Sequence, residues 1–377
     1  MKRICCVFGF APEYRRGIYE LMDKETEMEF DFYFGNTSYG GIKLMNVSKM
    51  THFRGALRNR YARNGKKLVW QGGFLKIFSK KYDAYILTGN PGIRSNWFIT
   101  LIAKLLRRPV FLWSHGIYGY EQGLQLKKNM AYFKFAGNIM TYGEHGRNML
   151  ILNGFKPEKV DVIWNSLDYD SMVQFRDKDI DRTIMRYYFG NDDPVMIFVG
   201  RLTENKNIEM LVQALAELNN KGENCNLMLI GDGPLMNKLN DMCRQLNIED
   251  RVWFYGECYD NQFLSIALRN SALCVSPGNV GLTAIHALTF GVPVITHNRA
   301  ELQMPEFEAV IPKQTGDFFE YGNLNDLVDK CSVWLQKMRS AESADKCRRE
   351  CMSMIDNRFN PHNQLKLIKE SLRKILG

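Results

Sequence analysis

Two basic residues follow a short apolar run in the second half of the sequence, at a spacing that suits a diphosphate. The run 194–199 ends at Gly200, and Arg201 and Lys206 come within the next six residues. Ligands of open α/β sheets bind at the carboxyl ends of the strands, and two cations ahead of a helix N-terminus favour a diphosphate. By themselves, the two residues fit a pair of surface charges equally well.

A loop that contains glycine follows another apolar run and leads into a short helix. Residues 276–294 are SPGNVGLTAIHALTFGVPV, and the pattern predicts a helix over 282–290 with Gly291 as its C-terminal cap. Amides at the start of this helix can bind phosphate or sugar oxygens. His286 lies one turn along the helix, where a single histidine on an apolar face is more often a core residue than a ligand.

Three further side chains come after predicted strands. His115, in the segment WSHG, and Glu144, in YGEHGR, follow strands of the first half, and Glu306 follows a strand at 292–297. His115 fits either a position near a reacting group or a buried structural role, and Glu144 fits either a crevice or a helix cap. The carboxylate of Glu306 is expected to face a ligand or, as is more common for such acids, solvent.

Short apolar runs alternate with helical patterns along the whole chain, which predicts βαβ units and parallel sheets. The runs lie at 3–10, 29–35, 83–89, 109–116, 138–143 and 160–165, and then at 194–200, 226–231, 251–256, 272–277 and 292–297. The sequence therefore predicts two doubly wound α/β domains. We expect these domains at 1–170 and 193–355, with a linker at 171–192 and a tail helix at 356–377.

The composition is that of an ordinary globular protein, and it excludes several classes. The 377 residues are 45% hydrophobic and 24% charged, which excludes disordered, collagen-like and coiled-coil chains. The cysteines and histidines show neither CxxC nor HxxxH, so no metal site is expected, and GxSxG is absent. A DxD triplet within 177–181 falls in the predicted linker, and we interpret it as a solvated charge run. The start of the chain is expected to be a buried strand rather than an export signal, which favours a cytoplasmic protein.

The excess of positive charge is concentrated in one segment. The formal net charge is +9, and the segment from Arg54 to Lys81 has nine basic residues and no acidic one. Trp70, Phe74 and Phe78 bring aromatic groups into the same segment. This combination fits an anionic membrane surface and, equally, a solvated loop and helix face. Nucleic acid is not expected, because no recognition motif accompanies the basic residues.

Taken together, the motifs resemble those of a known family. Gly200-Arg201 with Lys206, then GDGP at 231–234, then the glycine-containing loop and helix that end in GVPV at 291–294 are similar to glycosyltransferase family 4. The resemblance is good over 193–335 and weaker over 1–170. It implies the GT-B fold, with two Rossmann-like domains that face each other across a cleft. It also implies a retaining, metal-independent transferase that uses a nucleotide-diphosphate sugar and no other cofactor.

The resemblance also implies roles for individual positions. His115, Arg201 and Lys206 would be the catalytic residues, with the two cations on the donor diphosphate and the histidine near the reacting sugar. The expected donor-binding residues are Gly200, Arg201, Lys206, Cys258, Gly278, Val280, Gly281, Leu282, Thr283 and His286. Glu144 and Glu306 are expected to line the cleft.

The sequence departs from this family at one pair of positions. Members typically have two glutamates across the loop and helix, and the corresponding positions here hold Gly278 and His286. The first glutamate usually recognises sugar hydroxyls, and the second usually holds the ribose. His286 can still form a hydrogen bond with a ribose hydroxyl, whereas Gly278 has no side chain. The resemblance therefore does not identify the transferred sugar.

We expect a cytoplasmic glycosyltransferase of the hexosyltransferase type, peripheral at the inner face of the cell membrane. Its acceptor would be a glycan or a lipid-linked glycan in bacterial surface polysaccharide synthesis. Two alternatives stay open: a nucleotide-sugar epimerase with the same fold, and a catalytically silent homologue that acts as a binding partner. Arg201 and Lys206 argue against the silent homologue, and the small number of family motifs in the first domain favours transfer over epimerisation.

Overall fold

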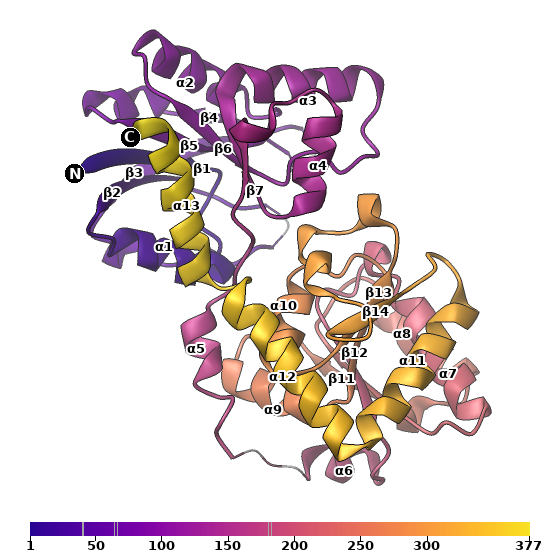
Figure 1. Cartoon of the computed structure of the whole chain (residues 1–377). Coiled ribbons are helices and arrows are strands. Elements are labelled where there is room, and N and C mark those ends of the chain that lie inside the picture. Colours follow the sequence, from indigo (N-terminus) through magenta and orange to yellow (C-terminus); the bar gives the residue numbers. More distant parts are fainter. Residues whose placement is uncertain (40, 64, 66, 180, 182) are drawn as a thin grey trace. The chain divides into compact units, whose positions relative to one another are not determined.

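The computed structural model describes residues 1–39, 41–63, 65, 67–179, 181 and 183–377, and it divides the chain into two compact units (Figure 1). Unit 1 comprises Met1–Asp168 and Asn360–Gly377, and unit 2 comprises Tyr169–Phe359. Each unit is built around its own sheet. The prediction of two α/β domains is therefore confirmed.

Unit 1 has, within its described residues, one sheet of eight strands in the order β4-β3-β2-β1-β5-β6-β7-β8. Neighbouring strands are parallel except β3 and β4, which pair antiparallel. The strands are β1 (Lys2–Phe8), β2 (Met28–Gly35), β3 (Phe53–Tyr61), β4 (Leu68–Gly72), β5 (Ala84–Thr88), β6 (Val110–Ser114), β7 (Gly137–Thr141) and β8 (Val160–Val162).

Both faces of this sheet are buried at its central strand β1, whose successive residues point to opposite faces. On β1, Ile4 and Cys6 pack in one apolar cluster, while Cys5 and Val7 pack in another. Residues of α1 and α13 belong to the first cluster, and residues of α2 and α3 belong to the second. The helices of unit 1 are α1 (Arg16–Asp23), α2 (Arg94–Leu105), α3 (Gly123–Ala136), α4 (Glu144–Leu152) and α13 (Pro361–Leu376).

Unit 2 has a parallel sheet of six strands, counted over its described residues, in the order β11-β10-β9-β12-β13-β14. The strands are β9 (Val195–Val199), β10 (Asn226–Ile230), β11 (Val252–Gly256), β12 (Leu273–Ser276), β13 (Val294–His297) and β14 (Gly316–Phe319). The helices are α5 (Tyr169–Val173), α6 (Ile184–Phe189), α7 (Ile208–Asn220), α8 (Met236–Gln245), α9 (Asn261–Arg269), α10 (Leu282–Thr289), α11 (Leu324–Arg339) and α12 (Ala341–Asn357). In the described parts of both units, no helix has the length and apolar character needed to cross a membrane.

The chain order of the strands reverses once in each sheet. In unit 1 the reversal lies between β1 and β5, and in unit 2 it lies between β9 and β12. Ligands of open α/β sheets bind outside the carboxyl ends of the strands at such switch points. The loops that follow these four strands are therefore the places where each unit is expected to bind a ligand.

The structure assigns two segments to the units differently from the expected domain boundaries. The segment 171–192, expected as a linker, carries α6 and the end of α5 and is part of unit 2, where Arg176 Nε donates to the Thr289 carbonyl at 2.7 Å. The segment 356–377, expected as one tail helix, contains the end of α12 in unit 2 and all of α13 in unit 1. Asn360 separates them because its side chain caps α13 by accepting from the Asn363 amide.

The basic segment from Arg54 to Lys81 includes most of β3, all of β4 and the 3₁₀ helix η3 (Phe74–Ser79). Arg63 and Lys67 lie between β3 and β4, outside both strands. On β3, Leu57 is buried whereas Arg58 and Arg60 are exposed, so the strand alternates between core and solvent. Lys66, one of the nine basic residues of this segment, lies outside the described residues.

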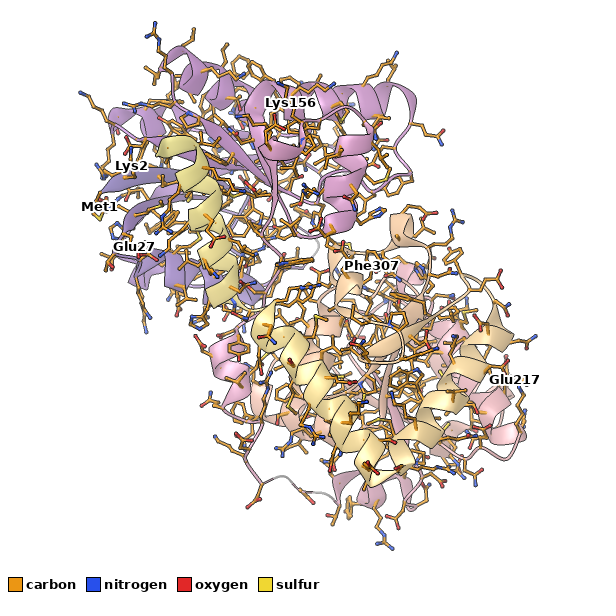
Figure 2. All side chains as sticks on the ribbon, in the orientation of Figure 1. Met1, Lys2, Glu27, Lys156, Glu217 and Phe307 are labelled. Carbon is orange, nitrogen blue, oxygen red and sulfur yellow. The ribbon has the colours of Figure 1, made fainter. Side chains whose placement is uncertain are left out.

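Helix α13 joins unit 1 from the far end of the sequence, and Figure 1 shows this yellow helix beside α1. Its Ile368 and Leu372 are fully buried in the same cluster as α1. Lys369 pairs with Glu25 at 2.8 Å and with Glu27, which is labelled in Figure 2, at 3.1 Å. The helix therefore completes the core of unit 1 rather than forming a free tail.

Replacing Ile368 by alanine should destabilise the protein by about 2–5 kcal/mol, because it leaves a cavity in the core of unit 1. Urea unfolding followed by tryptophan fluorescence measures the change. Ile375→Ala is the matched control, since Ile375 lies on the same helix with 36% of its surface exposed. Equal losses for the two variants would show that α13 does not pack as described.

Candidate functional site

Two loops meet at the switch point of unit 2. The first follows β9 and includes the 3₁₀ helix η5 (Glu204–Lys206), and the second follows β12 and leads into α10. The Gly278 amide donates to the Lys206 carbonyl at 2.9 Å, and the Asn279 amide donates to the Asn205 carbonyl at 3.4 Å. The two motifs that the sequence predicts for donor binding therefore lie against each other.

The ammonium group of Lys206 is held near the first turn of α10. Its Nζ donates to the carbonyl and to the Oδ1 of Asn279, both at 2.6 Å. A Cβ added to Gly281 would lie 3.9 Å from this Nζ. Burial lowers the pKa of Lys206 to about 8, and the negative charge of Glu306 opposes the shift. A cation beside the positive end of a helix forms a place where an anion is stabilised.

The backbone around Arg201 depends on close contact with the GDGP turn. Arg201 is exposed and follows Gly200, whose φ is 154°. A Cβ on Gly231 would lie 1.9 Å from the Gly200 carbonyl oxygen, so only glycine fits there. The Leu202 amide donates to the Asp232 carbonyl at 3.0 Å and fixes the loop that carries the arginine. The GDGP turn therefore supports the cation loop.

The first turn of α10 presents backbone amides that have no acceptor inside the helix. The turn begins after Gly281, whose φ of 52° and ψ of −148° are accessible only to glycine without strain. Thr283 Oγ1 donates to the Val199 carbonyl at 2.6 Å and anchors the helix on the end of β9. The amide of Val280, expected among the phosphate ligands, donates instead to Gln303 Oε1 at 2.9 Å. The expected phosphate-binding residues whose amides belong to this turn are therefore Gly281, Leu282 and Thr283.

Gly278 lies where no side chain fits. An added Cβ would be 2.1 Å from the Asn205 carbonyl oxygen and 2.6 Å from the Lys206 Cα. Gly278 is therefore part of the contact between the two loops. This contact leaves no room for the glutamate side chain that the resembling family typically has at this position.

His286 lies on α10 with its Nδ1 buried and without a hydrogen-bond partner in the described structure. Burial lowers the pKa of His286 to about 4, so the imidazole is neutral at physiological pH. A neutral imidazole can donate or accept one hydrogen bond at Nδ1. His286 thus packs as a core residue, but its Nδ1 is left without a hydrogen bond.

The other expected residues of unit 2 differ in their surroundings. Glu306 lies in the 3₁₀ helix η8 (Pro305–Ala309) with only 1% of its surface exposed, so it is no surface acid, and its charge acts on Lys206. Cys258 follows β11, which β10 separates from β9, and partial burial raises the pKa of its thiol. Glu306 thus belongs with the switch-point residues, whereas Cys258 lies further along the sheet edge.

Two of the expected residues, His115 and Glu144, belong to unit 1. His115 follows β6, and its Nδ1 is buried with no partner in the part of the chain that the structure describes. Burial, assisted by the charge of Arg15, lowers the pKa of His115 to about 4. Glu144 begins α4, is half-exposed and pairs with Arg147 at 3.7 Å, a favourable position for an acid at a helix start. The expected catalytic residues are therefore divided, with His115 in unit 1 and both cations in unit 2.

Sequence reasoning missed three side chains that the structure places at these sites. Asn279 holds Lys206, Gln303 occupies the Val280 amide, and Arg15 lies beside His115. Asn279 stands inside the quoted glycine loop, and Arg15 follows the first strand in the segment EYRR, which are the signals that could have drawn attention to them. Gln303 has no such signal, because its partner lies 23 residues earlier in the chain.

One group of metal-ligand side chains occurs among the described residues, namely Glu29, Asp31 and His52 in unit 1. Arg3 pairs with both carboxylates, at 2.8 Å and 3.0 Å, and Arg54 Nε also donates to Asp31. Two guanidinium groups thus compensate the two carboxylates, and this composition is typical of a structural ion-pair network.

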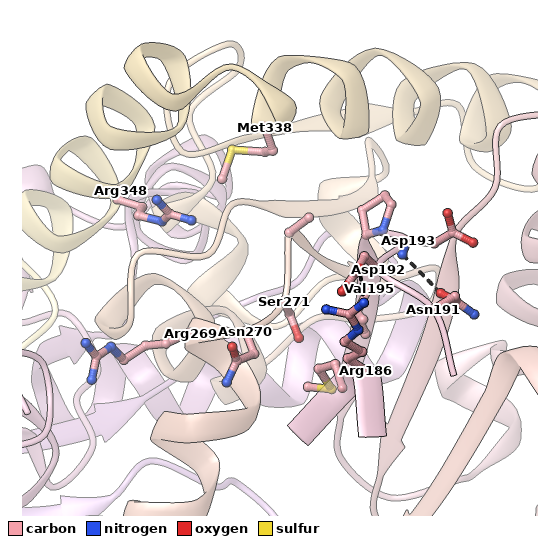
Figure 3. A pocket seen from close by; sticks show the side chains of 13 residues that line it. Arg186, Asn191, Asp192, Asp193, Val195, Arg269, Asn270, Ser271, Met338 and Arg348 are labelled. Atoms are coloured by element: carbon pink, nitrogen blue, oxygen red, sulfur yellow. Dashed lines mark hydrogen bonds and ion pairs between the residues drawn. The ribbon is translucent and has the colours of Figure 1, made fainter. Parts of the chain in front are cut away.

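A cavity in unit 2 lies at the amino ends of the strands, opposite the carboxyl ends where the candidate site lies (Figure 3). It is lined by residues that precede β9 and β12, including Asn191, Asp193, Arg269 and Ser271. The Asp193 amide donates to Asn191 Oδ1 at 3.0 Å, drawn as a dashed line. Because ligand crevices of such sheets lie at the carboxyl ends of the strands, this cavity is distinct from the candidate site.

The sequence is similar to known sugar transferases over part of its length. Residues 180–350 match the family model of the glycosyl transferases group 1. The chain is 29% identical over 138 residues to an alpha-D-kanosaminyltransferase of Streptomyces kanamyceticus, which covers 35% of this chain and 36% of that protein. It is 23% identical over 223 residues to an N-acetylgalactosamine-N,N'-diacetylbacillosaminyl-diphospho-undecaprenol 4-alpha-N-acetylgalactosaminyltransferase of Campylobacter jejuni, over 59% of this chain and 54% of that protein. The chain thus spans about a third to a half of the length of these curated relatives.

Solved structures match the whole chain. HepE of Anabaena, in complex with UDP, superposes with a TM-score of 0.71 at 17% identity and covers 100% of both chains. Likeness at this identity shows the fold, and the chain has the two-domain α/β fold of the GT-B glycosyltransferases. The chain is therefore similar in sequence to the glycosyl transferases group 1 over most of unit 2, and in fold to GT-B proteins throughout.

Placing a side chain at Gly278 should damage the site rather than restore a missing function. Gly278→Ala and Gly278→Glu are expected to lower the free energy of unfolding by about 1–3 kcal/mol or more, because the added Cβ forces the two loops apart. Urea unfolding measures the loss. Gly72→Ala is the control, since a Cβ there would meet its neighbours at 3.6 Å, an ordinary contact distance. Equal stability of Gly278→Glu and the native protein would refute the close approach.

Proposed function

We propose that the protein is a glycosyltransferase that moves a sugar from a nucleotide-diphosphate donor on unit 2 to an acceptor, with retention at the anomeric carbon. The observation that carries the proposal is the ammonium of Lys206, which Asn279 holds at the first turn of α10 beside the Arg201 loop. The family match over 180–350 supports it, since it includes all of these residues. UDP is the first nucleotide to test, because HepE was solved with UDP.

The proposed mechanism is electrostatic. When the bond between the anomeric carbon and the diphosphate oxygen breaks, negative charge develops on the departing diphosphate. Lys206, Arg201 and the first-turn amides of α10 would stabilise that charge, because preorganised donors and cations act most strongly where charge develops. In this proposal the two side-chain cations compensate the negative charge of the diphosphate without a metal ion. The reaction then needs the donor and the acceptor and no further cofactor.

The proposed acceptor is a glycan or a lipid-linked glycan of bacterial surface polysaccharide synthesis. The Campylobacter relative is named for a diphospho-undecaprenol acceptor, which supports this class. The enzyme would then work in the cytoplasm at the inner face of the membrane. Both named relatives are transferases, so a nucleotide-sugar epimerase and a silent binding partner are less favoured alternatives.

Replacing Arg201 or Lys206 by alanine should reduce turnover by roughly a hundredfold or more, because each variant removes charge stabilisation of the leaving group. The assay measures UDP release from UDP-sugars with acceptor present, together with UDP binding by calorimetry. Lys238→Ala is the control, since Lys238 is a surface lysine of unit 2 that pairs with Glu209. The anomeric configuration of the product, read by NMR, tests retention.

The pH dependence of UDP binding distinguishes Lys206 from a general basic surface. Because the pKa of Lys206 is about 8 in the free protein, the ammonium loses its proton as the pH rises through 8 and must regain it to bind. Affinity should therefore fall by up to about tenfold per pH unit above pH 8. The dependence should disappear in Lys206→Arg, which stays charged. Unchanged turnover in both alanine variants would reject the proposed function, and isomerised donor without acceptor would favour the epimerase.

We further propose that unit 1 contacts an anionic membrane surface, through the basic segment together with α2. On α2, Phe98, Leu101 and Leu105 are 46% to 75% exposed at helical spacing, and Leu75 of η3 is 66% exposed. The rings of Trp70 and Phe98 are 5.7 Å apart, which joins the segment to the helix. Most of the aromatic residues in the basic segment point into the core, so the apolar part of this surface comes from α2 and Leu75.

Positive charge surrounds these exposed apolar side chains. Near η3 and α2 in the sequence, the exposed basic residues are Lys76, Lys80, Lys81, Arg94, Lys104 and Arg107. The rest of the described basic segment adds the exposed residues Arg58, Arg60, Arg63 and Lys67. Neither 94–108 nor the segment from Arg54 to Lys81 contains an acidic residue. Apolar side chains on one helix face, flanked by lysine and arginine, are typical of a helix that lies in the plane of an anionic interface.

The double variant Leu101→Glu with Leu105→Glu should abolish binding to anionic vesicles, because it puts acids on the apolar face. Flotation with phosphatidylcholine vesicles, with and without phosphatidylglycerol, measures binding at low and high salt. Leu152→Glu is the matched control, since Leu152 of α4 is 78% exposed but lies away from the basic residues named above. Absence of salt-sensitive binding by the native protein, or equal binding by the double variant, would contradict the proposal.

A further inference from the structure

The switch point of unit 1 carries an arginine that the proposed donor chemistry does not use. Chain order reverses between β1 and β5, and the loop after β1 leads into the 3₁₀ helix η1 (Glu13–Arg15). Arg15 is the last residue of that helix. It therefore lies at the edge of the sheet where an open α/β unit binds its ligand.

Aromatic rings surround the guanidinium of Arg15. Its carbon Cζ lies 5.4 Å from the ring centre of Trp113, 5.0 Å from that of Tyr142 and 6.0 Å from that of Tyr14. Nη2 donates to the Tyr142 hydroxyl, while Nε is shielded from solvent and has no hydrogen-bond partner in the described structure. Rings attract the cation but do not accept in-plane hydrogen bonds from its N–H groups.

Among the described residues, no carboxylate forms an ion pair with Arg15. The carboxylates of unit 1 pair instead with other basic side chains, such as Arg3, Arg16 and Arg54. The neighbouring Arg16 shows the contrast, because it pairs with Glu13 at 2.5 Å and with Glu20 at 3.7 Å. The same short segment thus provides acids for Arg16 and none for Arg15. A shielded charge without an acidic partner is unfavourable unless a ligand supplies one.

Two further polar atoms beside Arg15 are also unsatisfied. Trp113 Nε1 and His115 Nδ1 are both buried without a partner in the parts of the chain described. The His115 ring lies 4.8 Å from the ring of Tyr142, which contacts Arg15, and 5.7 Å from that of Tyr118. Arg15 lies in η1 after β1, Trp113 lies on β6, and His115 directly follows β6. Three incomplete hydrogen-bonding groups therefore gather at the carboxyl ends of the strands.

We infer that unit 1 binds an oxyanion of the acceptor, a phosphate or a carboxylate group, with the guanidinium of Arg15 as its receptor. A planar guanidinium offers parallel N–H donors that match both groups, and the surrounding rings exclude water and suit a sugar or lipid attached to the anion. That the anion belongs to the acceptor rests on the proposed function, whereas the anion site rests on the surroundings of Arg15 alone. The residues of this site all belong to unit 1, whereas the proposed diphosphate site uses Arg201 and Lys206 of unit 2.

The experiment measures anion binding to the full chain in the background Arg201→Met with Lys206→Met, which removes the cations of unit 2. Inorganic phosphate, D-glucuronate and neutral D-glucose are titrated by calorimetry. Phosphate and glucuronate distinguish the two sources of the oxyanion, and glucose controls for binding of the sugar ring. We expect at least one of the two anions to bind and glucose to bind far more weakly.

In the same background, Arg15→Met should weaken anion binding by roughly ten- to a hundredfold, the usual effect of losing a charge-assisted hydrogen bond. Arg15→Lys keeps the charge without the planar donors and should give an intermediate loss. Arg16→Met is the matched control and should bind as the background protein does. If Arg15→Met fails to fold, Arg15→Lys against Arg16→Met carries the comparison.

Stability distinguishes a receptor from a structural arginine. Without ligand, Arg15→Met should unfold at the same temperature as the background protein or higher, because it removes an uncompensated charge. A lower unfolding temperature together with unchanged anion affinity would overturn the inference, as would absence of any anion binding. If native protein binds UDP but no anion binds at Arg15, the donor site stands and this inference falls. If anions bind through Arg15 but UDP does not bind, the proposed function falls and the anion site stands.

Discussion

The candidate donor site depends on one steric constraint, the contact between two backbones at the switch point of unit 2. A Cβ on Gly278 would lie 2.1 Å from the Asn205 carbonyl oxygen, and one on Gly231 would lie 1.9 Å from that of Gly200. Glycine costs conformational entropy on folding, so a chain that places it at both positions accepts a less stable backbone in return for close approach. That approach puts the carbonyl of Asn279 within reach of Lys206 and thereby holds an ammonium at the start of a helix.

Charge compensation separates structural cations from those available to a ligand. Arg3 and Arg54 lie against the carboxylate of Asp31, and this group needs nothing further. Lys206 is bonded to neutral oxygens of Asn279, and Arg15 is bonded to a neutral hydroxyl. An anion bound beside either of these two cations would gain a charge-assisted hydrogen bond. In each unit, the cation proposed to bind a ligand is thus hydrogen-bonded to neutral oxygens.

Much of the fold was predictable, because parallel strands buried on both faces appear as continuous apolar runs between helices. The motifs around Arg201 were predictable for the same reason, since they follow such runs directly. The position of α13 was not, because an amphipathic pattern shows that Ile368 faces a core but not which core. The strands of the basic segment were missed because Arg58 and Arg60 obscure the alternation with Leu57. Arg15 was missed because the rings of Trp113 and Tyr142 come from segments 98 and 127 residues away in sequence, and its position after the first strand does not reveal these contacts.

The two units carry different amounts of family information, and the proposed chemistry explains the difference. The family match covers 180–350, which lies in unit 2, where a donor diphosphate presents the same groups whatever the acceptor is. In the proposed function unit 1 would bind the acceptor, and because acceptors vary in shape and charge, that unit would share less sequence with relatives. On this argument, specificity would depend on residues of unit 1 such as Arg15, which lies outside the motifs that carry the resemblance. In the proposed function, the absence of a carboxylate at Gly278 would leave part of donor recognition to other residues. Glu306 is a buried acid whose charge acts on Lys206, so it is a candidate for that role.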